Sequence, residues 1–222
     1  MQRCEFALLV VAKAPVPGFA KTRLCPPASP SQAAEIAAVA LLDTLGAVLA
    51  TRGAVPIVAV TGEFDEAARS AELRRALRKL TVVPQRGGDF GERLANAHAD
   101  AATMVPGRPV LQIGMDTPQV TPGLLAEAAE LLVPGRDAVL GPAGDGGWWA
   151  LGLRDPMAAK VLTGVPMSRP DTGSRTLRAL TGAGLRTTPL RQLSDVDTMS
   201  DARRVARLTG GRFAAAVEEV AK

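Results

Sequence analysis

The stretch that decides the fold is FALLVVAKAPVPGFAKTRL, residues 6–24. Its first seven residues are apolar without alternation, which is typical of a strand covered on both faces in a parallel sheet. The loop that follows is shaped by prolines and a glycine, and it carries Lys13, Lys21 and Arg23. With its backbone amides turned inward, such a loop can hold a diphosphate or a triphosphate. The alternative is that these three residues are ordinary surface cations.

Predicted helices and strands alternate after this loop. Apolar residues at three- and four-residue intervals predict helices, and short apolar runs predict strands. In chain order we expect a helix from Ser29-Pro30 or Ser31 to about residue 49, a strand at 54–60, a helix at 65–80, a strand at 80–85, a helix to about 103, a strand at 109–114 and a helix from 121. This order predicts a right-handed, doubly wound, mostly parallel sheet with helices on both faces.

The last third of the chain departs from this alternation. The stretches DAVLGPA (137–143) and GWWALGL (147–153) read as two strands joined by a tight turn. After them come a helix at 172–181, a strand at 186–191 and a final helix with Ser200 as its N-cap. Because no long linker, repeat or low-complexity segment interrupts the chain, residues 1–222 are predicted to form a single α/β domain.

Composition narrows the class of protein. The net charge is +4, but only 3% of residues are aromatic and there is no tyrosine, so nucleic-acid binding is not expected. Cys4 and Cys25 show no metal-ligand or disulfide spacing, which suits the cytoplasm. Residues 33–50 approach the length of a membrane span, yet acidic residues and a glycine interrupt them, so we expect a core helix and no membrane association.

Carboxylates follow two later segments in positions that suit a metal. Asp116 comes directly after the predicted strand at 109–114, at the sheet edge where ligands bind in such folds. Mg²⁺ takes one or two carboxylates together with phosphate oxygens, so Asp116 is the first candidate ligand. Asp195 and Asp197 are alternate residues of an extended segment and point the same way. One of them can be a metal ligand while the other orients it or caps the final helix.

Two glycine-rich motifs offer weaker signals. In RGGDFGERL, Gly88 and Asp89 precede a helix, where close backbone approach and the helix N-terminus favour an anion or the polar edge of a ring. Asp145, in GPAGDGGWW, can bind a ribose, an acceptor hydroxyl or a metal, or can simply form the turn. His98 is the sole histidine and lies mid-helix, so we expect a structural role; the sequence does not favour Ser-His-Asp or Cys-His hydrolysis, and it offers too few ligands for zinc.

Five ordered motifs together resemble a known family. They are KAPVPGFAKTRL, GGDFGERL, IGMDTPQV, GPAGDGGWWALGL and the late DVDT. The chain resembles bacterial proteins usually labelled as family-A-like glycosyltransferases (DUF2064 type). These resemble 2-phospho-L-lactate guanylyltransferase and, more distantly, the molybdenum cofactor guanylyltransferases. Two departures stand out: the first loop lacks the L-A-G-G opening of the molybdenum cofactor enzymes, and the D-x-D of sugar transferases is reduced here to Asp116-Thr117-Pro118.

The resemblance implies a nucleotide-diphospho-sugar transferase (GT-A-like) fold and assigns roles to residues. It implies phosphate contacts for Lys13, Lys21 and Arg23, and Mg²⁺ or Mn²⁺ on Asp116 and Asp197. It also places Gly88 and Asp89 near the base or ribose of the nucleotide. Asp145 and Gly146 are expected on the acceptor side. We therefore expect Lys21, Arg23 and Asp116 to be the catalytic residues.

Three functions stay open at this stage. A nucleotidyltransferase would join a nucleoside monophosphate from a triphosphate to a small phosphate or carboxylate acceptor and release pyrophosphate. The basic loop favours it, because a triphosphate carries more charge than a nucleotide sugar. A glycosyltransferase with a nucleotide-sugar donor is the alternative favoured by the family label. A non-catalytic nucleotide-binding module is the third, although the carboxylates argue against it.

Overall fold

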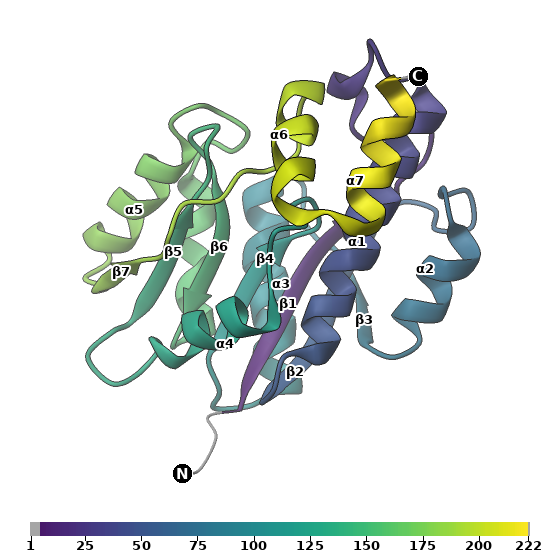
Figure 1. Cartoon of the computed structure of the whole chain (residues 1–222). Helices are drawn as coiled ribbons and strands as arrows, with labels where there is room; N and C mark the ends of the chain where they lie inside the picture. The colour runs from purple at the N-terminus through teal and green to yellow at the C-terminus, as the bar shows by residue number, and fades with distance from the viewer. Residues whose placement is uncertain (1–4, 222) are drawn as a thin grey trace.

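Strand β1 (Phe6–Lys13) lies inside a seven-stranded sheet in the computed structural model, which describes residues 5–221. All of β1 except Lys13 is buried, as expected for a strand without polar alternation. It pairs in parallel with β2 (Ala54–Thr61) and with β4 (Val110–Gly114). The strand order is β3-β2-β1-β4-β6-β5-β7 (Figure 1). The predicted mostly parallel α/β fold is confirmed.

The two edges of the sheet differ in strand direction. At one edge, β3 (Thr81–Pro84) is parallel to β2. Toward the other, β6 (Trp148–Leu153) runs antiparallel to both β4 and β5 (Ala138–Pro142), and β7 (Thr187–Pro189) is parallel to β5. The reversal at β6 follows from the short turn before it, because a parallel connection needs a crossover of about a dozen residues or more.

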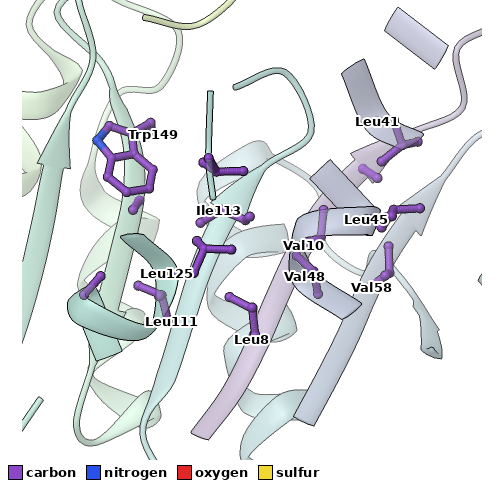
Figure 2. Packing of buried hydrophobic residues seen from close by; sticks show 14 of the residues in the cluster. Leu8, Val10, Leu41, Leu45, Val48, Val58, Leu111, Ile113, Leu125 and Trp149 are labelled. Carbon is purple, nitrogen blue, oxygen red and sulfur yellow. The ribbon is translucent and has the colours of Figure 1, made fainter. Parts of the chain in front are cut away.

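Helices cover both faces of the sheet. On one face, α1 (Pro30–Ala50) and α4 (Pro122–Glu130) pack on alternate residues of β1 and β4, as Figure 2 shows for Leu8, Val10, Leu111 and Ile113. On the other face, α3 (Phe90–Met104) and the 3-10 segment η2 (Pro156–Gly164) cover the strand residues whose side chains point to that face, such as Ala7 and Leu9 of β1. The period-two alternation of β1 and β4 thus divides the core into two layers.

Helix α1 is buried on more than one side. Its N-terminus has the capping box in which Ser29 and Gln32 bond each other's backbone amides. Beyond the sheet-facing side, α1 also packs against α6 (Met199–Thr209) and α7 (Gly211–Glu218), with Phe213 fully buried between them. The helix has the length and apolarity of a membrane span, but 67% of that window is buried inside the protein. It is therefore the core helix that the sequence predicted.

Some predicted element boundaries were wrong. α2 spans Ser70–Leu77 rather than 65–80, because Arg69 takes a left-handed conformation (φ 53°) that stops the helix from extending backward. The last predicted helix begins with Thr198 as its N-cap rather than Ser200, since Thr198 forms a capping box with Asp201. α5 spans Thr172–Gly182, close to the predicted 172–181. Two short 3-10 segments are η1 (Thr22–Leu24), in the basic loop, and η3 (Glu219–Ala221), after α7.

η2 and α7 were not anticipated from the sequence. Cys25 is a free thiol, while Cys4 lies outside the described residues.

Candidate functional site

The predicted motifs meet at one edge of the sheet. β1 to β4 are mutually parallel. β6 is antiparallel to both β4 and β5, so β5 runs in the same direction as β4, and β7 is parallel to β5. Their carboxyl ends therefore share an edge. The basic loop, the Asp116 segment, the turn at 143–147 and the segment at 190–197 all follow strands at this edge. Ligands of open α/β sheets bind at such an edge.

A cavity of about 930 Å³ opens at this edge, a size typical of a small-molecule site. Its wall includes Lys13, Arg23, Asp116, Asp145 and Asp197. A smaller hollow of about 320 Å³ adjoins it under the basic loop and shares four of these residues, all except Asp145. Cations and carboxylates from distant parts of the sequence therefore line one depression.

Lys21 is the centre of the charged cluster. Its Nζ donates to Oδ2 of Asp116 in a short hydrogen bond and to Oδ1 of Asp197 at 2.7 Å. Only 14% of the Lys21 side chain is exposed, against 25% for Asp116 and 30% for Asp197. A partly buried ammonium thus bridges two carboxylates that stand 95 and 176 residues away in the sequence.

The other two predicted cations differ in their contacts. Arg23 reaches Oδ2 of Asp197 at 3.2 Å but is 73% exposed, so its guanidinium is open to a ligand. Lys13 donates through Nζ to the carbonyl of Phe19 at 2.8 Å and so ties the basic loop to the end of β1. Because an ammonium has three N–H donors, Lys13 can hold the loop and still face the cavity that it lines.

Local backbone conformation positions Lys21. Its φ of 50° lies in the left-handed region, immediately before η1. Leu24, the last residue of η1, is fully buried against α1 and anchors the turn. On the opposite side, Gly114 leaves room for Asp116, because a Cβ there would stand 2.9 Å from Oδ1 of that residue. The backbone carbonyl of Asp116 also accepts from the amide of Val196 at 3.0 Å, which brings the segment at 195–197 alongside it.

The charge states follow from burial and from the neighbouring charges. Burial alone would lower the pKa of Lys21, but Asp116 and Asp197 raise it above the ordinary lysine value. Lys21 therefore remains a cation. Burial, reinforced by the charge of Asp116, raises the pKa of Asp195 to about 7, although a hydrogen bond from Thr117 opposes this shift. The cluster therefore carries less negative charge at neutral pH than its count of carboxylates suggests.

Two polar side chains hold the segment that carries Asp195 and Asp197. Thr117 Oγ1 donates to Oδ1 of Asp195 at 2.7 Å. The amide of Gln119 exchanges hydrogen bonds with the backbone of Ser194. Neither Asp195 nor Asp197 caps α6, because Thr198 and Asp201 do so together. Asp195 also lines the cavity, so the two alternate carboxylates face the same space, as the sequence predicted.

Asp145 combines the two roles that the sequence left open. Its Oδ1 accepts from the amide of Gly147 at 2.8 Å, which closes the turn between β5 and β6. It also lies on the cavity wall. Gly146 does not line the cavity. It packs against the loop before α5, where an added Cβ would come within 1.8 Å of the carbonyl oxygen of Pro170.

Gly88 and Asp89 are not brought to the cavity wall. The amide of Gly88 donates to Oε2 of Glu92 at 2.7 Å, and Oδ1 of Asp89 accepts from the amide of Glu92 at 2.8 Å. These bonds begin α3, because Asp89 is its N-cap. The structure therefore uses both residues to start a helix, and the nucleotide contacts expected for them stay a prediction.

His98 is fully buried on α3, in agreement with the predicted structural role. Its Nε2 lies 3.1 Å from Oε1 of Gln112, a buried residue of β4 that reaches the cavity. Because Oε1 can only accept, Nε2 carries the proton. Burial lowers the pKa of His98 to about 4, although the hydrogen bond to Gln112 opposes this shift, so the ring is neutral.

Several cavity residues were not predicted from the sequence. Gln85 and Arg93 line the side next to β3 and α3, and Arg169 and Thr172 line the side next to α5. Gln85 is the last residue of the strand predicted at 80–85 and directly follows the observed β3, so its position at a strand end was a usable signal. Arg169 lies in a loop after the unpredicted segment η2, and no sequence motif around it indicated a site residue.

Comparisons with solved structures agree on the fold. A protein from Desulfovibrio desulfuricans G20 described as a "putative nucleotide-diphospho-sugar transferase" is 26% identical, with a TM-score of 0.83 over 97% of this chain and 95% of that one. A cytidylyltransferase from Leptospira borgpetersenii is 13% identical, with a TM-score of 0.59 over 98% and 94% of the two chains. A CMP:2-keto-3-deoxy-manno-octonic acid synthetase in complex with CTP is 12% identical, with a TM-score of 0.54 over 97% and 99%.

A search of curated proteins found no match. A family model described as "Uncharacterized protein conserved in bacteria (DUF2064)" matches residues 44–169, more than half of the chain. This region contains β4, Asp116 and the turn of Asp145. The chain therefore belongs to the DUF2064 family, and it has the fold of nucleotide-diphospho-sugar transferases and nucleotidyltransferases.

Proposed function

We propose that this protein is a nucleotide-dependent transferase, and specifically a nucleotidyltransferase that uses a nucleoside triphosphate and a small phosphate or carboxylate acceptor. One observation carries the proposal. The ammonium of Lys21, in the smaller hollow, bridges Asp116 and Asp197, and both of these carboxylates also line the adjoining cavity, which is large enough for a nucleotide. Arg23 stands beside them with its guanidinium exposed. Arginine and lysine side chains are the usual partners of phosphate oxygens, and this supports a polyphosphate as the ligand.

In the proposed reaction, an acceptor oxygen attacks the α-phosphorus of the triphosphate. A new P–O bond forms, the bond to pyrophosphate breaks, and its electron pair leaves with pyrophosphate. A phosphate or carboxylate oxygen is already anionic at neutral pH, so this attack needs no general base. The negative charge on the leaving group is what the protein must stabilise. Lys21, held cationic by its neighbours, and Arg23 supply fixed positive charge for it.

Asp116 and Asp197 fit a Mg²⁺ or Mn²⁺ ion. Lys21 takes one oxygen of each carboxylate, so a metal ion would be held by the other two, Oδ1 of Asp116 and Oδ2 of Asp197, beside the ammonium. In residues 5–221, no group of three or more His, Cys, Asp or Glu side chains is arranged to hold a metal. Phosphate oxygens and water would have to complete the coordination, which is the usual arrangement for Mg²⁺. When bound, the ion would add positive charge at the phosphates.

The experiment is a thermal-shift panel of nucleoside triphosphates and nucleotide sugars, with and without Mg²⁺. A ligand that binds the native state alone raises the melting temperature by mass action. Stabilisation by a triphosphate in the presence of Mg²⁺, followed by release of pyrophosphate when small phosphorylated or carboxylated acceptors are added, supports the proposal. Stabilisation by a nucleotide sugar and by no triphosphate contradicts it.

A glycosyltransferase is the second candidate. The observation in its favour is the likeness, at a TM-score of 0.83, to the protein described as a putative nucleotide-diphospho-sugar transferase. In that reaction the leaving group is a nucleoside diphosphate, and Asp145, on the cavity wall, would contact the acceptor hydroxyl. Release of a nucleoside diphosphate from a nucleotide sugar would establish it. Sustained release of either product excludes a non-catalytic binding module.

A cytoplasmic location and the lack of nucleic-acid and membrane partners remain predictions. They follow from the composition and from the buried state of α1.

A further inference from the structure

Gln85 has a side-chain orientation that its neighbours fix. Its Nε2 donates to the carbonyl oxygen of Ala12 at 2.9 Å and to that of Ala59 at 3.0 Å. A primary amide has two N–H donors and one carbonyl acceptor, so both donors are in use. The reversed orientation would place Oε1 against two carbonyl oxygens, which cannot donate. The ends of β1 and β2 therefore determine which way this amide points.

The remaining acceptor of this amide, Oε1, has no partner within the part of the chain that the structure describes and belongs to a residue of the cavity wall. Gln85 is partly buried and forms part of the cavity wall. Of the buried side-chain polar atoms in residues 5–221, only Nδ1 of His98 lacks a partner, so Oε1 of Gln85 is not sealed inside the protein. A fixed carbonyl oxygen on a cavity wall selects ligands that present a donor. It disfavours ligands that present another oxygen at the same place.

We infer that Oε1 of Gln85 accepts a hydrogen bond from an exocyclic amino group of the donor's nucleobase. This inference rests on the proposed function, which supplies the nucleotide. It names the part of the nucleotide that the β3 side of the cavity recognises. Two other polar side chains line the cavity near β3: Arg93, which can only donate, and Thr61, whose hydroxyl can rotate and therefore both donates and accepts.

The arrangement of the sheet supports this placement. The phosphates belong near Lys21, in the loop after β1, and β3 lies two strands away from β1. At the usual strand spacing this is roughly 10 Å, about the reach of a nucleoside from its phosphate to the far edge of its base. Phe90, the first residue of α3, lines the same side and is 45% exposed, which leaves its ring open for stacking.

The test compares nucleotides that differ in one amino group, on the wild-type protein with Mg²⁺. The pairs are CTP against UTP, ATP against ITP, and GTP against xanthosine triphosphate, which carries an oxygen in place of the 2-amino group, with affinities measured by calorimetry. In at least one pair we expect the amino nucleotide to bind about tenfold tighter or more, because an oxygen at that place would face Oε1 unpaired. Equal affinity in all three pairs, or preference for the oxo partner, overturns the inference.

Variants then assign the preference to Gln85. In Gln85→Leu the ratio within the selective pair should fall to within about threefold, because leucine can neither donate nor accept. Arg169→Gln, on the α5 side of the cavity, should keep the ratio even if overall affinity changes. A Gln85→Leu protein that folds and keeps the full ratio overturns the assignment. If Gln85→Leu does not fold, Gln85→Met, which also lacks the amide, should lower the affinity ratio in the same way. The ratios of the wild-type protein test the inference in either case.

Failure of this inference can be told apart from failure of the proposed function. If triphosphates bind without regard to the amino group, the inference alone is overturned. If only nucleotide sugars bind, the cytidine and uridine diphosphate sugars provide the same matched pair, and the inference is judged on them. If no nucleotide binds, the proposed function is overturned, and the inference with it.

Discussion

Replacement of His98 by glutamine should remove a large part of the acid sensitivity of this protein. His98 is the sole histidine of the chain, is fully buried on α3, and donates from Nε2 to Gln112. Burial lowers its pKa from 6.5 to about 4. Glutamine carries its amide nitrogen near the position of Nε2, so it can keep the donor to Gln112 but cannot take up a proton.

The sign of the effect follows from proton linkage. The folded protein binds a proton at His98 less readily than the unfolded chain does, because the folded pKa is the lower one. Stability from the neutral ring is therefore complete above pH 6.5 and is lost as the pH falls toward 4. The full difference between the two pKa values corresponds to about 3 kcal/mol, of which about 2 kcal/mol is lost by pH 5.

Asp195 must be separated from this effect. Its pKa is raised to about 7, so its contribution has the opposite sign and favours the folded state as the pH falls. Because Asp195 is present in both proteins, it cancels when the wild type is compared with His98→Gln. The carboxylates with lowered pKa, such as Asp137 and Asp201, act mainly below pH 4 and cancel in the same way.

The assay is urea denaturation of both proteins at pH 7.5 and at pH 5. Between these values the wild type should lose about 2 kcal/mol of unfolding free energy relative to His98→Gln. Since there is one histidine, its ring resonances can also be followed by NMR without assignment. They should show no protonation of the folded protein down to about pH 5. A ring that titrates near 6.5, or equal pH dependence in the two proteins, would refute the reasoning.

Four other substitutions, the last of them a control, test the site and the fold that supports it. Asp116→Asn should abolish metal-dependent turnover while the protein still folds, as a cooperative urea transition would show; unchanged turnover would remove Asp116 from the site. Lys21→Gln should lower turnover by at least about a hundredfold, because the buried cation between two carboxylates is lost, and added salt should not restore it. Gly146→Ala should destabilise the fold by about 2 kcal/mol or more, because φ is 90° and a Cβ would overlap the carbonyl of Pro170. Its matched control is Gly46→Ala, inside α1, where an added Cβ would have no atom within 4 Å. This control should stabilise the protein by roughly 0.5–1 kcal/mol. Denaturation curves that show equal effects of the two alanines would contradict this account.

Local sequence determined most of the secondary structure. The apolar run of β1, the Ser29-Pro30 start of α1 and the Thr121-Pro122 start of α4 each depend on residues within one or two turns of each other. Such signals can be read directly because caps and periodicity act over short distances. The alternation of these elements was enough to predict a doubly wound sheet and the edge at which its ligands bind.

The contacts of the site were decided by tertiary structure. Asp116 and Asp197 were identified as carboxylates near the ligand, but only the strand order shows that both meet the same ammonium. Gly88 and Asp89 illustrate the opposite outcome, since their local pattern suits both a nucleotide contact and a helix start. The folded chain uses them for the helix, because Glu92 lies within reach of both.

Gln85 shows the physical reason most directly. Its place at the end of a strand could be predicted from the sequence, but the direction of its amide depends on the carbonyls of Ala12 and Ala59, which belong to two other strands. Periodicity and caps are properties of neighbouring residues, so the sequence by itself determines the elements and their order. The partner that each polar group finds depends on register and packing between distant segments, and only the tertiary structure decides it.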